Sequence, residues 1–170
     1  MPKKPPTPKP VIGWREWISL PELGIAAVKA KVDTGARTSA LHAFDVHVFR
    51  RRGVRMVRFK VHPLQRNSRR TVETEAVVLD RRTVKSSTGH EHERIVILTE
   101  LELAGQRWPI ELTLASRDAM GFRMLLGRQA VRGHFTVDPG RSFFGGRPSR
   151  KERGLPPLKK RKKKPAGASD

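Results

Sequence analysis

The chain has 170 residues, enough for one ordinary domain with loose ends. Cysteine is absent, which excludes disulfides, zinc sites built from thiolates and cysteine nucleophiles. The formal net charge is +20, and more than half of the excess lies in the two ends of the chain. No apolar run approaches the roughly 20 residues of a membrane span, and the Pro/Lys-rich start lacks the apolar core of a secretory signal. We therefore expect a cytoplasmic protein without membrane contact.

The first third of the chain is predicted to bring an acidic residue to the end of a strand. Residues 1–10 are rich in Pro and Lys and are expected to be disordered. Alternating apolar residues predict a strand, or two short ones, over 11–20. After a turn at 21–24, a second strand over 25–32 leads directly into Asp33. This hairpin would anchor the loop that follows on paired backbone.

Short strands separated by turn residues continue to the end of the predicted domain. They cover residues 39–49, 54–62, 72–79, a short stretch after Asp80-Arg81-Arg82, 94–103, 108–114 and 134–137. Helix is expected only as a turn over 116–121 and a short segment over 128–132. Many short strands with little helix predict an all-β protein, either a barrel or a sandwich. From 141 onward Gly, Pro and basic residues dominate, and we expect a folded domain over 11–144 and a disordered basic tail over 145–170.

The segment Asp33-Thr34-Gly35 is the strongest candidate for chemistry. Gly35 leaves the backbone free to turn and lets its N–H approach the carboxylate. Thr34 offers a hydroxyl that could fix the loop against a partner, and Ala36 is too small to crowd a second carboxylate. Two carboxylates about 3 Å apart share one proton, so one can activate water while the other protonates a peptide carbonyl.

One such segment supplies only half of a carboxylate pair. A second copy related by a two-fold axis would supply the other Asp33, and two-fold dimers are the commonest oligomers. The sequence therefore predicts a homodimer whose two Asp33 residues activate water to hydrolyse a peptide or protein substrate. The alternative interpretation of Asp33-Thr34-Gly35 by itself is an ordinary turn without a catalytic role.

A second segment strengthens the catalytic interpretation. Met124-Leu125-Leu126-Gly127-Arg128 has the apolar-apolar-Gly pattern that packs beneath the catalytic loop of pepsin-like and retroviral proteases. The order of Asp-Thr-Gly and then apolar-apolar-Gly in one small β-domain resembles the retropepsin-like aspartic proteases. The chain is also similar to the bacterial proteins often labelled ATP-dependent zinc proteases, which are treated as retropepsin-like and found beside RimK-type ATP-grasp ligases. The similarity extends over about residues 11–144, in segments 12–16, 20–25, 30–41, 84–87, 111–114, Arg117, Met120, 124–128 and 135–138.

The resemblance implies a closed acid-protease β-barrel with a dimeric active site. It implies that Asp33 is catalytic, that Thr34 and Gly35 form its loop, and that Leu126 and Gly127 support the loop. The older label mentions zinc and ATP, but the chain has no His-Glu-x-x-His, no Gly-x-x-x-x-Gly-Lys and no Cys. We therefore expect no cofactor and no metal site.

Other features leave alternatives open. His90-Glu91-His92-Glu93 could hold zinc if it lay on a strand, although a polar loop after Gly89 is the simpler interpretation. Arg117 and Arg128 could contact an acidic substrate, or make structural ion pairs instead. The run 159–164 could bind a polyanion weakly, without base stacking, because no aromatic residues interrupt it. The whole chain could also be a non-catalytic module that binds a peptide or a RimK-type ligase.

Overall fold

The computed structural model describes residues 2–85, 88–116 and 121–159, and of residues 84 and 85 only the backbone. Strands dominate it, as the sequence predicts. The strands are β1 (Val11–Gly13), β2 (Arg15–Leu20), β3 (Ile25–Asp33), β4 (Ser39–His42), β5 (Phe44–Arg51), β6 (Val54–Val61), β7 (Val72–Lys85), β8 (Glu91–Leu103), β9 (Gln106–Ala115), β10 (Met124–Gly127) and β11 (Thr136–Asp138). A 3-10 turn η1 (Pro21–Leu23) and the helix α1 (Arg128–Val131) complete the described elements.

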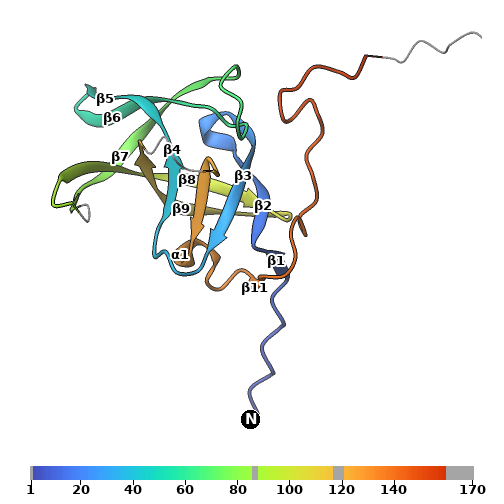
Figure 1. Ribbon diagram of the computed structural model, residues 1–170. Helices are drawn as coiled ribbons and strands as arrows, with labels where there is room; N and C mark the ends of the chain where they lie inside the picture. The colour runs from blue at the N-terminus through green and yellow to red at the C-terminus, as the bar shows by residue number, and fades with distance from the viewer. Residues whose placement is uncertain (1, 86–87, 117–120, 160–170) are drawn as a thin grey trace, which may run out of the picture.

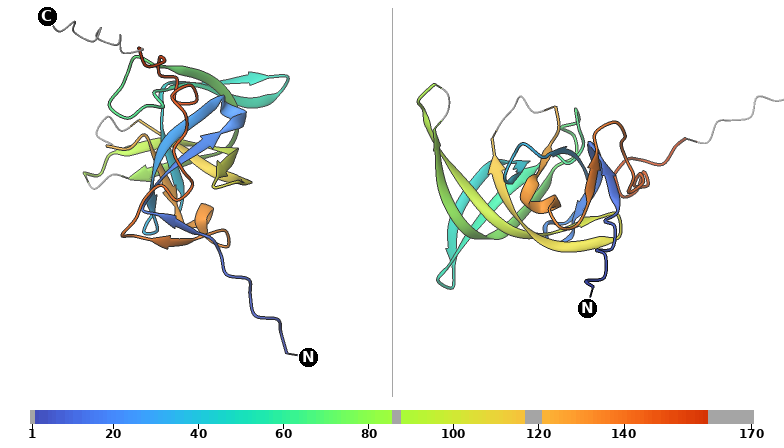
Figure 2. Two further views of the ribbon diagram at one scale, coloured as in Figure 1. Left: turned by 90° about the vertical axis from the view of Figure 1, so that its right-hand side faces the viewer. Right: turned by 90° about the horizontal axis from the view of Figure 1, so that it is seen from below.

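The main sheet closes into a barrel. Nine strands follow the order β2-β3-β10-β4-β9-β8-β7-β6-β5, and β2 also pairs with β8 through Ser19 and Glu102. This extra pairing closes a ring of β2, β3, β10, β4, β9 and β8, which Figure 2 shows from below. The prediction of a closed all-β barrel with a short helix is therefore confirmed. The described residues contain no helix long and apolar enough to cross a bilayer.

Strand β10 lies between the two strands that flank the Asp33 loop. It pairs in parallel with β3 and antiparallel with β4, and α1 lies at its end (Figure 1). Because both neighbours cover it, its sequence Met-Leu-Leu-Gly is almost wholly apolar, as expected for an interior strand. Leu126 and Met124 are fully buried in the core. Two segments that are about ninety residues apart in the sequence thus meet as neighbouring strands.

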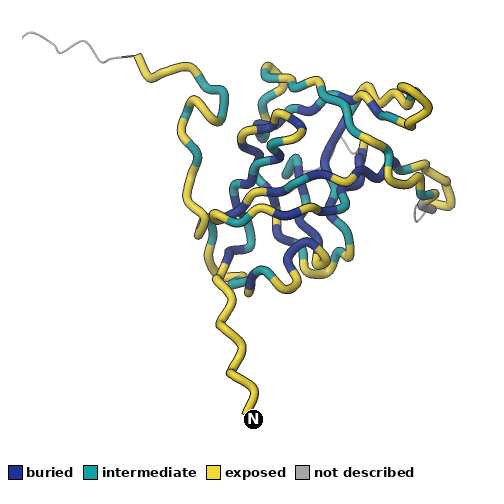
Figure 3. The backbone as a smooth tube through the Cα atoms, turned by 180° about the vertical axis from the view of Figure 1, so that it is seen from behind, coloured by how far each residue is buried: buried dark blue, intermediate teal, exposed yellow. Residues whose placement is uncertain are grey.

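The barrel interior is filled by alternate residues of its strands. Leu41, Ile97, Leu112 and Leu126 have no exposed surface. Figure 3 shows that buried residues gather in the barrel, whereas residues 2–10 are exposed throughout. Burial of such side chains contributes about 1.5–3 kcal/mol each, so the barrel rather than the ends stabilises the fold.

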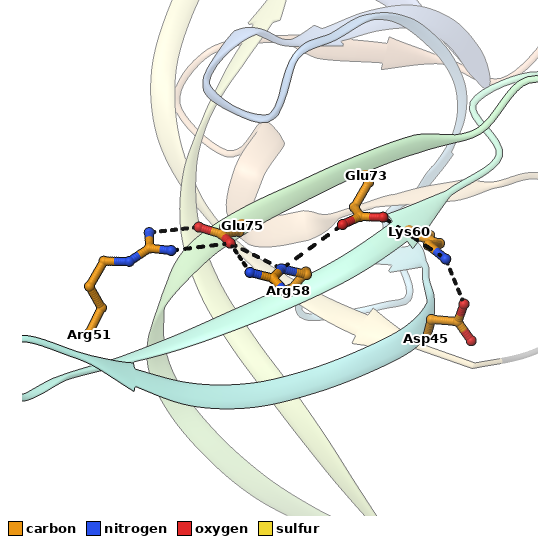
Figure 4. A network of polar contacts seen from close by, with 6 residues as sticks. All are labelled: Asp45, Arg51, Arg58, Lys60, Glu73 and Glu75. Carbon is orange, nitrogen blue, oxygen red and sulfur yellow. Dashed lines mark hydrogen bonds and ion pairs between the residues drawn. The ribbon is translucent and has the colours of Figure 1, made fainter.

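Strands β5, β6 and β7 form an extension of the sheet beyond the barrel. Strand β7 belongs to both parts, since its first half pairs with β6 and its second half with β8. Across the outer face of the extension, ion pairs join neighbouring strands (Figure 4). Glu75 accepts hydrogen bonds from Arg51 at 2.7 Å and from Arg58 at 2.9 Å, and Lys60 donates to Asp45 at 3.0 Å.

Three sequence predictions about strand limits are wrong in detail. The strand expected over 39–49 is divided at Ala43, where the chain leaves the barrel for the extension. The interruption expected at Asp80 is a shift of register within the continuous strand β7, because one extra residue is accommodated between Val78 and Asp80. Strand β8 begins at Glu91, so most of the segment expected to be a polar loop is paired backbone. The helical turn expected over 116–121 falls largely on residues 117–120, which lie outside the described residues.

Candidate active site

Asp33 is the last residue of β3, and its half-buried side chain is fixed by its own loop. One carboxylate oxygen, Oδ1, accepts hydrogen bonds from the backbone N–H groups of Gly35 at 3.0 Å and Ala36 at 3.2 Å. Within the described part of the chain, the other oxygen, Oδ2, accepts no hydrogen bond. The loop therefore orients the carboxylate while leaving one of its oxygens available for a water molecule or a second carboxyl group.

The beginning of α1 holds the loop from the other side. The backbone N–H of Arg128 donates to the carbonyl oxygen of Ala36 at 2.7 Å, and that of Gln129 donates to Arg37 at 3.1 Å. The first N–H groups of a helix have no partner within the helix, so they are available for such contacts. The Arg128 guanidinium also donates to the carbonyl oxygen of Thr34 at 3.0 Å. Three carbonyl groups of the loop are thus anchored to one short segment.

Gly127 allows this close approach. It is the register partner of Asp33 in the β3–β10 pair. A Cβ atom on Gly127 would lie 2.5 Å from the carbonyl oxygen of Thr38 and 2.9 Å from the nitrogen of Ser39, so only glycine fits. The N–H of Gly127 donates to the buried Ser39 hydroxyl at 3.0 Å. Backbone contact, rather than side-chain packing, sets the distance between β10 and the end of the loop.

A hollow opens beside the loop, between it and strands β7 and β9. It has a volume of about 420 Å³ and is lined by Arg37, Thr38, Arg82, Glu111 and Gln129. Arg82 forms ion pairs with Asp80 at 2.9 Å and Glu111 at 3.3 Å, which fix one wall. Hydrogen bonds from the Arg82 guanidinium and then from the Arg81 backbone N–H hold the pKa of the Asp80 carboxyl below its usual range. Both signs of charge therefore line the hollow.

The structure brings most of the predicted site residues together. Asp33, Thr34, Gly35 and Ala36 form the loop, and Leu126 and Gly127 lie beneath it. Arg128 lies at the loop too, but its contact is with the Thr34 carbonyl oxygen rather than with a carboxylate. Arg117 lies outside the described residues. The exposed Thr34 side chain points to no described partner, so the expected locking hydroxyl stays a prediction for the dimer.

Sequence reasoning missed Ser39 and the residues of the hollow. Ser39 belongs to the small-residue segment after Asp-Thr-Gly, but nothing in that segment shows that its hydroxyl will accept the Gly127 N–H. Glu111 and Arg82 come from strands distant in the sequence, so their pairing is visible only once β7, β8 and β9 are in register.

The zinc alternative depends on the His-Glu-His-Glu segment, residues 90–93. His92 lies on β8, opposite Val84, and is exposed. Among the described residues, no group of three or more His, Asp or Glu side chains is placed to hold a metal ion. Tetrahedral zinc sites in proteins use three or four such ligands, so the described part of this segment does not form one by itself.

Comparison with known proteins identifies the same kind of fold as the barrel and the Asp33 loop indicate. The family model described as RimB-like, retropepsin-like aspartic endopeptidase RimB, matches residues 11–148. This match includes the Asp33 loop, β10 and every strand of the barrel. The chain belongs to the RimB-like family of retropepsin-like aspartic endopeptidases. The recognition of a retropepsin-like protein from the sequence is thus confirmed.

Curated relatives of this RimB-like chain carry another name. Proteins from Desulfotalea psychrophila and Shewanella pealeana, each named probable alpha-L-glutamate ligase, are 50% identical over 131 residues and 47% identical over 136 residues. The matches cover 77 and 80% of this chain but only 28 and 30% of those proteins. The chain therefore spans less than a third of their length.

A solved structure shows the same fold. The crystal structure of Lpg0085 from Legionella pneumophila, described as a protein with unknown function, superposes with a TM-score of 0.67. The superposition covers 80% of this chain and 98% of that one, with 24% sequence identity. At this identity the likeness concerns the fold alone.

Proposed function

We propose that this RimB-like protein is an aspartic-type endopeptidase in which two copies of the chain each contribute Asp33. The observation that supports it most directly is the Asp33 loop itself. Its carboxylate is held through Oδ1 by two N–H groups at the end of β3, beside Gly127, where an added Cβ atom would clash with backbone atoms. A structural turn would need neither the free carboxylate oxygen nor the anchoring by α1.

The proposed reaction uses the two carboxyl groups in different protonation states. The ionised Asp33 takes a proton from water, and the water oxygen forms a bond to the peptide carbonyl carbon. The protonated Asp33 of the second copy donates to the carbonyl oxygen. The carbon–nitrogen bond then breaks as the nitrogen receives the proton that the first Asp33 took from water. One hydroxyl of the intermediate returns its proton to the Asp33 of the second copy, so an amine and a carboxylic acid are released and the pair again shares one proton. The two groups titrate as one unit.

The substrate is proposed to be acidic. The curated relatives are named as glutamate ligases, and this chain matches one part of them. A peptidase beside an enzyme that adds glutamate would meet peptides that carry carboxylates. Arg128, which lies against the Asp33 loop, and Arg117 are proposed to contact such a substrate. A RimK-type ligase is proposed as a partner.

A non-catalytic role is the second candidate, because the relatives are named for ligation and not for hydrolysis. In that case the barrel would bind a peptide or the ligase without cleaving anything. The two candidates differ in where the Asp33 carboxylates lie. The peptidase requires them to meet across a dimer axis, whereas the binding module does not.

Cleavage of a peptide library by the parent protein and by the Asp33→Asn variant tests the proposal. Asparagine keeps an oxygen that can accept the Gly35 and Ala36 N–H groups, so the loop and the dimer mass should be unchanged. We expect cleavage to fall by about 100- to 10,000-fold, as for other losses of general acid–base catalysis. Equal cleavage by the two proteins at equal dimer content would overturn the assignment.

A further inference from the structure

The segment that follows β11 returns along the outer side of β2. The N–H of Trp14 donates to the carbonyl oxygen of Arg141 at 2.9 Å. The N–H of Phe143 donates to the carbonyl oxygen of Arg15 at 3.1 Å. The Glu16 carboxylate, which is fully buried, accepts hydrogen bonds from the next two N–H groups along the segment, at 3.0 and 2.8 Å. These contacts hold the segment that carries Phe143, drawn in orange-red in Figure 1, beside β2. The Phe143 ring lies close to Arg15 of β2 and Lys29 of β3.

Cations from three separate parts of the chain gather on two aromatic rings. Arg15, Arg147 and Lys29 lie 4.8, 4.9 and 5.7 Å from the centre of the Phe143 ring. Lys29 also lies 5.2 Å from the centre of the Trp17 ring, and Arg153 lies 5.9 Å from it. We refer to these residues as the cation–aromatic cluster; they are Arg15, Trp17, Lys29, Phe143, Arg147 and Arg153.

The cluster holds positive charge without a carboxylate. Among the residues that the structure describes, no Asp or Glu lies within ion-pair distance of its four cations. The Nε atoms of Arg15 and Arg153 are buried and have no hydrogen-bond partner. Burial lowers the pKa of the Lys29 ammonium, and the neighbouring Arg15, Arg147 and Arg153 lower it further. The aromatic rings offset part of this repulsion, but they cannot satisfy the guanidinium donors.

A second group in the same molecule shows how such an arrangement is completed. On the β5–β6–β7 extension, Arg51 and Arg58 lie 5.2 and 5.4 Å from the centre of the Phe49 ring. There the Glu75 carboxylate bridges the two guanidiniums at 2.7 and 2.9 Å. Around Phe143 the arginines are gathered in a similar way, and the bridging carboxylate is the component that is missing.

We propose that the cation–aromatic cluster binds side-chain carboxylates of an acidic peptide segment. Guanidinium groups bind carboxylates with two parallel hydrogen bonds, and Arg15 and Arg147 both lie close to the Phe143 ring. Cations already lie close to both rings, so nucleic-acid bases would have to displace them in order to stack there. A hollow of about 280 Å³ continues from Trp17 and Arg147, and Glu102 and Glu152 line it. These carboxylates would repel a phosphate backbone, whereas a peptide can place its uncharged backbone there.

The position of the cluster connects it with Asp33. Side chains alternate along a strand, so Lys29, Lys31 and Asp33 lie on one face of β3. Lys29 and Asp33 are about 13 Å apart along the strand at about 3.3 Å per residue. If the proposed peptidase activity holds, an acidic segment bound at the cluster lies about four extended residues from the cleaved bond. Binding itself does not depend on hydrolysis.

Binding of a labelled hexaglutamate peptide to the Asp33→Asn protein tests the proposal, because this substitution removes the carboxylate proposed to cleave the probe. Fluorescence anisotropy at about 0.15 M salt, where surface charges are largely screened, should show binding that a hexaglutamine peptide does not match. In the same protein, Arg147→Gln with Arg153→Gln should weaken binding at least about tenfold. Arg55→Gln with Arg132→Gln removes the same charge from exposed positions and should change binding less than about twofold.

Three results would overturn the proposal. One is an equal loss of binding in the two double variants, which would show attraction by net charge alone. Another is binding of a thymidine oligonucleotide as tight as that of hexaglutamate and equally sensitive to the two cluster arginines, which would assign the site to nucleic acid. The third is no preference for hexaglutamate over hexaglutamine. Since hydrolysis takes no part, each result is independent of whether Asp33 is catalytic.

Discussion

The strands around Asp33 and the β5–β6–β7 extension are held together in different ways. At Asp33, β10 is enclosed by β3 and β4, and backbone atoms of Gly127 and Thr38 meet without space for a methyl group. On the extension, exposed side chains join the strands through Arg51, Arg58 and Glu75 (Figure 4). Exposed ion pairs typically contribute about 1 kcal/mol or less.

This difference indicates which region the fold must keep rigid. A catalytic carboxylate has to stay within fractions of an ångström of its position, and contact between backbones cannot adjust by rotation of a side chain. The extension only has to remain paired, so long side chains that rearrange in solvent are sufficient. Substitutions in the two regions should therefore have effects of different size.

The largest effect is expected from Gly127→Ala. The added methyl group would meet the Thr38 carbonyl oxygen and the Ser39 nitrogen, both of which are backbone atoms that cannot turn away. We expect a loss of about 3 kcal/mol in the free energy of unfolding, at the upper end of overpacking. Urea denaturation measures it. Gly121→Ala, where nothing lies within 4 Å of the added atom, is the matched control. Equal stability of both variants would mean that β10 and the loop are not in close contact.

Ser39→Ala is expected to have the next largest effect. It removes the acceptor of the Gly127 N–H, which then stays buried without a partner. The free energy of unfolding should fall by about 1–3 kcal/mol, measured in the same way. Ser68→Ala changes an exposed serine and should leave stability unchanged. If both serine variants unfolded at the same urea concentration, the Ser39 hydrogen bond would contribute nothing.

Gly35→Ala separates stability from activity. Its Cβ atom would lie 3.2 Å from Asp33 Oδ1, close enough to displace the carboxylate but not to disrupt the core. We expect a small change in stability, below about 1 kcal/mol, because the position is exposed. Cleavage should fall about tenfold or more, because misplacement of a catalytic group is costly. Unchanged cleavage would argue that the loop does not orient a catalytic group.

The smallest effect is expected from Glu75→Gln on the extension. Hydrogen bonds from Arg51, and then from Arg58, lower the pKa of the Glu75 carboxyl below its ordinary value of 4.5. A lowered pKa stabilises the fold above pH 4.5, and this contribution is lost as the pH falls through the lowered value. The parent should therefore unfold at a slightly higher temperature than the variant at pH 7, and the difference should shrink below pH 4.5. Glu22→Gln, at an exposed carboxylate without an ion pair among the described residues, should show no such difference.

Much of the fold and the centre of the site could be predicted from the sequence. Alternation of apolar residues locates most strands, and Asp-Thr-Gly after an apolar run predicts a loop at a strand end. The apolar Met-Leu-Leu-Gly segment predicts an interior strand because only such a strand is covered on both sides. These signals are local, or they repeat with the period of one element.

The remaining features depend on contacts between distant segments. Nothing near Ser39 shows that its hydroxyl faces Gly127, and the role of Arg128 depends on where the Thr34 carbonyl oxygen lies. The register shift at Leu79 lets β7 serve two parts of the sheet, although Asp80 and its neighbours resemble a turn. The cation–aromatic cluster combines β2, β3 and the segment beyond β11, so no short motif could have shown it.

The central claim is that each active site needs Asp33 from two chains, and a mixing experiment tests it most directly. Parent and Asp33→Asn proteins are combined in equal amounts, allowed to exchange subunits, and assayed for peptide cleavage at constant total protein. If pairing is random and both carboxylates are required, about a quarter of the activity of the pure parent should remain. A remainder of about one half, as expected when each chain works alone, would contradict the account.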